Sequence, residues 1–204
     1  FALDLDGTLT EAGDVLSDQV KQVLSWLRGM AVTVVAITAQ GWDYALHMGA
    51  DFSVFDVIVT EKGLHTRFAN GRNPVLHDAP NYSPYLQEMY LLLTEINAAS
   101  NTLVVEKTAG YAVRFYGPDG HQLLPAQKQR IEQVMRQQAA RSNGVFIIDA
   151  TTNFLDLTPS AFSKGQALKY LKSIGVFNNK PVIAAGNGDT DEPMLEEADV
   201  GVTV

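Results

Sequence analysis

The chain has 204 residues, of which 46% are hydrophobic, and a formal net charge of −8. This composition is enough to bury the core of one large domain or of a domain with a sizeable insertion. The negative charge argues against binding to nucleic-acid backbones and anionic membranes, because both attract basic surfaces. The absence of cysteine excludes disulfides and thiolate metal sites, and no apolar run is long enough to span a bilayer. We therefore expect a cytoplasmic protein whose partner is a small molecule, and the sequence leaves the oligomeric state open.

The first third of the chain alternates between strand and helix patterns. Residues 1–5 predict a strand, and residues 17–28 predict a helix in which Ser17 is the N-cap and apolar side chains recur at helical spacing. Almost every residue of 31–38 is apolar, which is typical of a buried parallel strand. A helix over 42–49 and a strand over 54–60 follow. The alternation predicts a parallel sheet with helices on both faces.

The middle of the chain has a different pattern. Residues 64–72 predict a hairpin around the turn pair Asn70-Gly71, and 78–84 have the composition of a boundary. Two repeats of helix, strand and strand follow. They are predicted at 85–99, 102–107 and 111–116, and then at 125–141, 145–149 and 153–157. This order indicates an α+β module inserted into the first domain.

The alternating pattern returns near the end, with a helix over 163–174, a strand over 181–185, a helix over 192–198 and a strand over 199–204. We therefore predict an α/β protein with a Rossmann-like parallel-sheet core and one inserted α+β domain. The expected boundaries are 1–80 and 159–204 for the core, with 81–158 for the insertion.

Two carboxylates, Asp4 and Asp6, stand where the first apolar strand gives way to the turn Gly7-Thr8. Charged groups at the edge of a core are costly unless they are paired or bound to a metal. One carboxylate can attack an electrophile such as phosphorus, and the other can transfer a proton. Alone, such a pair is more often a turn closed by the Asp6 side chain, and the apolar strand before it and the DGTLT segment favour the chemical role.

Three further groups stand near strand ends. Thr38 closes the second apolar strand, where its hydroxyl can donate to a phosphoryl oxygen. Lys164 opens a helix, where a cation opposes the helix dipole and therefore indicates a nearby anion. Residues 186–192 (GNGDTDE), which include Asn187 and Asp191, follow an apolar strand and offer oxygen ligands suited to Mg²⁺. Parallel strands bring all of these groups to one edge of a sheet.

Taken together, these segments resemble the four motifs of the haloacid dehalogenase superfamily of phosphotransferases. DLDGTLT at 4–10 is similar to the first motif, Thr38 to the second, Lys164 to the third and GNGDTDE to the fourth. The position of the insertion, between Thr38 and Lys164, resembles the type C2 cap, in its B form. DGTLT and VVEK (104–107) are similar to trehalose-phosphate phosphatases, and sucrose-phosphate phosphatases share the layout.

The resemblance implies a mechanism and a set of site residues. Asp4 would form an aspartyl-phosphate, Asp6 would act as the general acid and base, and Thr38 and Lys164 would hold the phosphoryl oxygens. The Mg²⁺ ligands implied are Asp4, Asp6, Asn187 and Asp191. The phosphate contacts implied are Gly7, Thr8 and Ala39. Candidate substrate contacts on the cap are Glu106, Lys107 and Arg114.

The sequence departs from the family pattern at Asn187, where aspartate is usual, and at Gly188, where the trehalose-type pattern has a second acid. An amide oxygen can bind Mg²⁺, but the loss of one negative charge should weaken the binding. We expect a Mg²⁺-dependent phosphatase of a sugar phosphate, such as trehalose 6-phosphate. The alternatives are a phosphomutase of the phosphomannomutase type and a catalytically weakened protein that binds a phosphorylated ligand.

Overall fold

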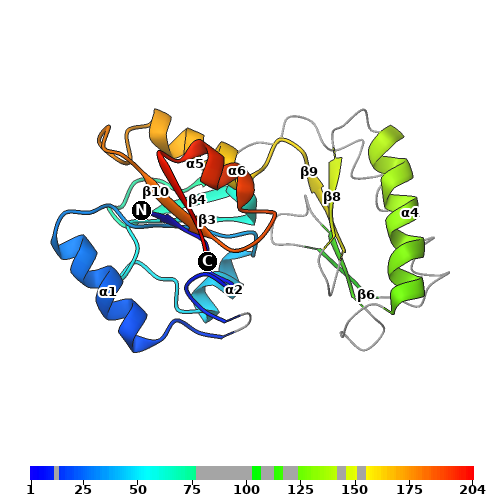
Figure 1. Ribbon diagram of the computed structural model, residues 1–204, viewed down its shortest axis with the longest axis horizontal. Helices are drawn as coiled ribbons and strands as arrows, with labels where there is room; N and C mark the ends of the chain where they lie inside the picture. Colours follow the sequence, from blue (N-terminus) through cyan, green and yellow to red (C-terminus); the bar gives the residue numbers. More distant parts are fainter. Residues whose placement is uncertain (12–13, 77–102, 107–112, 117–123, 142–145, 151–154) are drawn as a thin grey trace. The chain divides into compact units, whose positions relative to one another are not determined.

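The computed structural model describes residues 1–11, 14–76, 103–106, 113–116, 124–141, 146–150 and 155–204 (Figure 1). The chain forms two compact units, one made of 1–78 with 162–204 and the other made of 79–161. The sequence boundaries expected at 80/81 and 158/159 lie within three residues of these. None of the described helices has the length and apolar character needed to cross a membrane.

The first unit, here called the core unit, contains a seven-stranded sheet in the order β11-β10-β1-β2-β3-β4-β5. The central strands β1 (Ala2–Leu3), β2 (Val35–Ile37), β3 (Val57–Thr60), β10 (Ile183–Gly186) and β11 (Val200–Thr203) pair in parallel. The strands β4 (His65–Phe68) and β5 (Val75–Leu76) extend the sheet in antiparallel pairing. The predicted α/β class is confirmed, and the predicted hairpin turn joins β4 to β5.

Helices cover both faces of this sheet (Figure 1). Helices α5 (Lys164–Ser173) and α6 (Glu192–Glu197) pack against Val35, Ile37 and Val59 on one face. Helices α1 (Asp18–Gly29) and α2 (Trp42–His47) pack on the other face with the alternate strand residues, such as Ala36 and Ile58. Both faces of β2 and β3 are therefore buried, which explains why these strands are apolar throughout.

The predicted strand over 31–38 begins four residues too early. Helix α1 continues through Gly29, and the Val32 N–H donates to the carbonyl oxygen of Leu27 at 3.1 Å. Ala31 takes a left-handed backbone with φ 57°. These residues therefore close the helix, and regular pairing starts only at Val35. The Ser17 N-cap is confirmed, since its hydroxyl accepts the Val20 N–H at 3.3 Å.

The second unit, here called the inserted unit, contains a four-stranded antiparallel sheet in the order β6-β7-β9-β8. Its strands are β6 (Leu103–Glu106), β7 (Val113–Tyr116), β8 (Phe146–Ala150) and β9 (Leu155–Pro159). Helix α4 (Pro125–Arg141) packs on β8 and β9 and buries Ile131 and Met135. Both predicted strand pairs are present, and β7 pairs with β9 to join them. The helix predicted over 85–99 lies outside the described residues.

Candidate active site

Most functional side chains of the core unit come from loops at the carboxyl ends of neighbouring parallel strands, and Lys164 comes from the start of α5. Leu3 of β1 is in register with Ala36 of β2 and with Ala185 of β10, and the Asp4 N–H donates to the Ala185 carbonyl oxygen at 3.0 Å. The chain therefore leaves these three strands at adjacent points. Open α/β sheets bind their ligands at this edge.

Asp4 and Lys164 form a buried ion pair at this edge. The Lys164 Nζ donates to Asp4 Oδ1 at 2.5 Å, and the two side chains are 2% and 5% exposed. The Thr8 hydroxyl donates to the other Asp4 oxygen at 3.0 Å. Burial raises the pKa of the Asp4 carboxyl above its ordinary value, the Lys164 ammonium opposes this rise, and the Asp191 carboxylate adds to it. Asp4 therefore depends on a nearby positive charge to remain ionised.

Asp191 holds Lys164 from the other side. Its Oδ1 accepts from Lys164 Nζ at 2.5 Å, and its Oδ2 accepts the N–H groups of Asn187 and Gly188, both at 3.1 Å. The side chain is 2% exposed. Gly186 permits this arrangement, because a Cβ there would lie 2.3 Å from the Asp191 Cβ. Since both carboxylate oxygens have partners in the protein, Asp191 is placed to position Lys164 and the 186–192 loop.

Asp6 is held by a tyrosine that the sequence analysis did not single out. The Tyr44 hydroxyl, on α2, donates to Asp6 Oδ1 at 3.0 Å. Helix α2 starts four residues after Thr38, so the helix that follows the second motif orients the acid of the first. The one sequence signal for this role is the short spacing between Thr38 and the helix that carries Tyr44, because a single tyrosine on a short helix can have many other roles.

Gly7 and Thr8 use their backbone donors within their own loop. The Gly7 N–H donates to the Thr10 carbonyl oxygen at 2.7 Å, and the Thr8 N–H donates to that of Leu5 at 3.2 Å. Gly7 has φ 79°, which favours glycine. The phosphate-binding role expected of these two residues stays a prediction.

Thr38 lies at the end of β2 and is 1% exposed. Its Oγ1 accepts the Gln40 N–H at 3.1 Å, so the hydroxyl keeps its own proton for another acceptor. Its carbonyl oxygen accepts the Lys62 N–H at 3.0 Å. Ala39, the other residue expected to contact phosphate, follows in the same loop and is half-buried.

Asn187 lies against the first-motif loop. A Cβ added to Gly7 would fall 2.0 Å from Asn187 Nδ2, so the amide fits only because residue 7 has no side chain. This contact brings Asn187 beside the Asp6-Gly7 segment, and its role as a metal ligand stays a prediction. No group of three His, Cys, Asp or Glu side chains converges as a metal cluster within the part of the chain that the structure describes. An ion here would need amide and backbone oxygens as well.

The donor set and its charge fit Mg²⁺. Lys164 pairs with both Asp4 and Asp191, so one ammonium faces two carboxylates in this buried network. A divalent cation would help to balance the excess negative charge. Oxygen donors from carboxylate, amide and carbonyl groups are those that Mg²⁺ prefers.

The candidate contacts on the inserted unit stay predictions. Glu106 ends β6 in register with Val113, and Arg114 of β7 is in register with Val105. Lys107 lies outside the described residues.

Comparisons with known proteins agree with this fold. Residues 121–204 match the family model of haloacid dehalogenase-like hydrolases. The C-terminal domain of trehalose-6-phosphate phosphatase from C. albicans is similar in structure, with TM-score 0.72, 15% identity, and coverage of 96% of this chain and 71% of that one. A haloacid dehalogenase-like hydrolase from Bacteroides thetaiotaomicron has TM-score 0.69 and 16% identity, with coverage of 99% and 92%.

The sucrose-phosphatase from Synechocystis sp. PCC6803 has TM-score 0.67 and 16% identity, with coverage of 100% of this chain and 81% of that one. No curated protein sequence matches the chain significantly. At these identities the structural neighbours establish the fold, which is the one predicted. With the family match, they confirm the predicted resemblance to haloacid dehalogenase phosphatases and support a phosphatase.

Proposed function

We propose that this chain is a Mg²⁺-dependent phosphatase of a small phosphorylated metabolite. It has the fold of the haloacid dehalogenase-like hydrolases, and its carboxyl-terminal part matches their family model. The observation that carries the proposal is the buried network in which Lys164 bridges Asp4 and Asp191 at 2.5 Å each. Maintaining three buried charges is costly in free energy, and phosphoryl transfer gives a reason to keep them at the ligand-binding edge of a sheet.

Asp4 is the proposed nucleophile. One of its oxygens bonds to phosphorus as the substrate's ester oxygen leaves, which gives an aspartyl-phosphate and an alcohol. Lys164 and the Thr38 hydroxyl donate to the phosphoryl oxygens, whose negative charge they stabilise in the transition state. The Thr8 hydroxyl orients the Asp4 carboxylate throughout.

Asp6 is the proposed general acid and base. It gives a proton to the leaving alcohol and then takes one from the water that hydrolyses the aspartyl-phosphate. The hydrogen bond from the Tyr44 hydroxyl to Asp6 Oδ1 restricts the orientation of this carboxylate.

Asp4, the Asp6 carbonyl oxygen and Asn187 are the groups we assign to Mg²⁺. When bound, the ion would screen the repulsion between the Asp4 carboxylate and a phosphate dianion. Asp191 is assigned to positioning, because one of its oxygens accepts from Lys164 and the other accepts two backbone N–H groups of its own loop, whereas the second Asp4 oxygen accepts a single hydroxyl among the described residues. The inserted unit is the proposed cap that selects the substrate, with Glu106, Lys107 and Arg114 as candidate contacts.

A sugar phosphate of the trehalose 6-phosphate type is the expected substrate, on the strength of the VVEK segment and of the trehalose- and sucrose-phosphate phosphatases among the structural neighbours. The test is phosphate release from a panel of sugar phosphates, with Mg²⁺ and with a chelator. Release should require Mg²⁺ and should fall to background in Asp4→Asn.

The matched control for Asp4→Asn is Asp199→Asn, since Asp199 is also an aspartate that contacts a lysine but lies elsewhere in the core unit. This control should retain full turnover. Failure of every substrate to release phosphate would refute the proposal. Isomerised sugar phosphate without free phosphate would instead identify a phosphomutase.

A further inference from the structure

The turn that follows β3 has an unusual backbone. Glu61, Lys62 and Gly63 have φ values of 51°, 60° and 120°, so three successive residues lie in the positive-φ region and two of them are not glycine. Glutamate and lysine rarely adopt this conformation, because their Cβ atoms crowd the backbone. Such strain persists only where the surrounding structure imposes it, and it is concentrated at functional sites.

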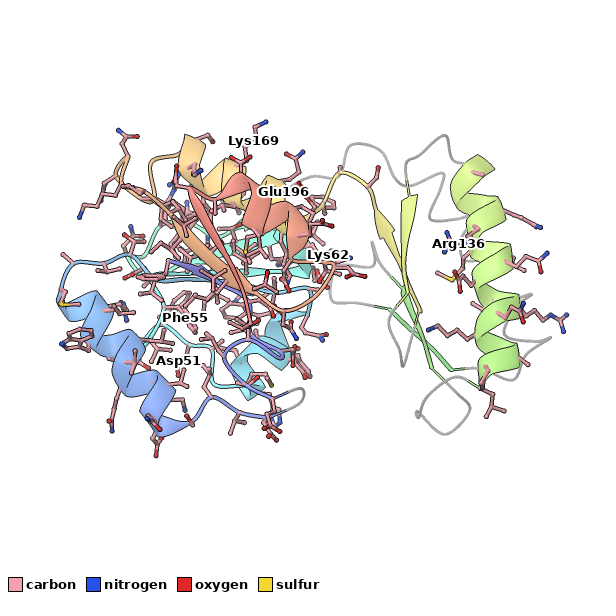
Figure 2. All side chains as sticks on the ribbon, in the orientation of Figure 1. Asp51, Phe55, Lys62, Arg136, Lys169 and Glu196 are labelled. Atoms are coloured by element: carbon pink, nitrogen blue, oxygen red, sulfur yellow. The ribbon has the colours of Figure 1, made fainter. Side chains whose placement is uncertain are left out.

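The turn is also buried, although it carries two charged residues. Glu61 is 7% exposed, and Lys62, which Figure 2 labels, is 5% exposed. Charged residues are rarely found at this level of burial. Neither residue has a role in the mechanism proposed above.

Two consecutive N–H groups of the turn hold the Thr38 loop. The Glu61 N–H donates to the Gln40 carbonyl oxygen at 2.9 Å, and the Lys62 N–H donates to the Thr38 carbonyl oxygen at 3.0 Å. Neighbouring N–H groups point in opposite directions in an extended strand, so a strand could not direct both at the same loop. The left-handed backbone is what makes them converge.

The other end of the turn contacts the start of α5. A Cβ added to Gly63 would lie 3.2 Å from the Ala167 Cβ and 3.7 Å from the Ser163 carbonyl oxygen. Ser163 is the N-cap of α5, and Lys164 is the first residue of that helix. One three-residue turn therefore contacts the loop that carries Thr38 and the helix end that carries Lys164.

We infer that the Glu61–Gly63 turn is a positioning element that sets the relative placement of Thr38 and Lys164, and that it acts through its left-handed backbone at Lys62 and not through the lysine charge. The inference rests on the proposed function, in which these two side chains hold the same phosphoryl group. Both side chains must lie within hydrogen-bond distance of the phosphoryl oxygens, so a shift of the turn would weaken transition-state binding.

The experiment is a series of substitutions at residue 62. Glycine and asparagine adopt a left-handed backbone most readily, alanine less so and valine least. If the backbone is what matters, Lys62→Gly and Lys62→Asn should keep kcat within about threefold. Lys62→Ala should be intermediate, and Lys62→Val should lose about 100-fold, mostly in kcat, as expected for misplaced catalytic groups.

The matched control is Asn179→Val, because Asn179 has φ 56° and no part in the site. It should lower the melting temperature as Lys62→Val does, while kcat stays unchanged. If Lys62→Val does not fold, Lys62→Ala against Lys62→Asn gives the same comparison. Tungstate affinity, measured by calorimetry as a probe of phosphoryl binding, should follow the same order.

Two outcomes would overturn the inference. Equal loss of kcat in all four variants would assign the role to the ammonium group, and kcat unchanged from the unsubstituted protein in all four would show that the turn does not position the site. The tungstate series separates this inference from the proposed function. An unmodified protein without phosphatase activity would refute the proposed function, while the order of tungstate affinities would still test the turn.

Discussion

Asp191→Asn tests the buried charge network most directly. Asparagine has nearly the same shape as aspartate, but it has one acceptor oxygen in place of two. In the structure one Asp191 oxygen accepts from Lys164 and the other accepts two backbone N–H groups of the 186–192 loop. The variant must therefore turn an NH₂ group toward either the ammonium or the loop amides, and one side loses its acceptor.

The size of the effect follows from these contacts. A hydrogen bond to a charged group contributes about 1.5–3 kcal/mol, and removing one partner of a buried ion pair costs about 3–5 kcal/mol. Lys164 retains Asp4 as a partner, so we expect the free energy of unfolding to fall by about 3 kcal/mol. For a chain of this size the melting temperature should drop on the order of 10 °C. Because Lys164 also shifts, kcat should fall about 100-fold.

The assay combines thermal unfolding with kcat measured across a Mg²⁺ titration. Asp199→Asn is the control and should change the melting temperature less and kcat not at all. An Asp191→Asn variant with unchanged kcat and unchanged melting temperature would refute the reasoning. Recovery of kcat at high Mg²⁺ would show instead that Asp191 is a metal ligand, as the sequence analysis expected.

Three further predictions concern single residues. Asn187→Asp should lower the Mg²⁺ concentration needed for half-maximal activity on the order of tenfold, because it adds a negative charge to the ligand set; an unchanged or higher requirement would contradict its assignment. Lys164→Met removes the charge that opposes the rise in the Asp4 pKa, so this pKa should move further up in a carboxyl ¹³C titration, and a downward shift would refute the pairing. Gly165→Ala should cost about 2 kcal/mol in urea unfolding, because the new Cβ would lie 2.4 Å from a carbonyl oxygen of α6, whereas Gly29→Ala meets nothing within 4 Å and should cost nothing.

The core fold was predictable because local and long-range signals agree there. In β2 and β3 both faces are buried, so their apolar runs are unambiguous, and Ser17 caps α1 as its type and position indicate. The strand starts were less predictable. The cap of α1 uses Ala31 and Val32, whose apolar side chains look like strand residues while their backbone closes a helix.

The charged residues of the site were predictable because burying them requires a reason, as with Asp4 and Lys164. The separate roles of these residues could not be predicted from the sequence. Asp191 was expected to bind metal, which stays a prediction, and the contacts of its two oxygens favour the positioning role proposed above, which spacing along the chain could not reveal. Tyr44 and the Glu61–Gly63 turn were missed because each acts through a hydrogen bond that exists only once distant loops have come together.

The strand order has a consequence for how the polypeptide is made. β1 lies between β2, which follows it closely in the sequence, and β10, which is separated from it by the whole inserted unit. During synthesis, residues 79–161 therefore leave the ribosome while one edge of β1 still lacks its neighbour, and an uncovered strand edge is a site of mispairing. An inserted unit that folds early on its own would shorten the effective tether between the two halves, and the growing chain would spend less time with its central strand exposed.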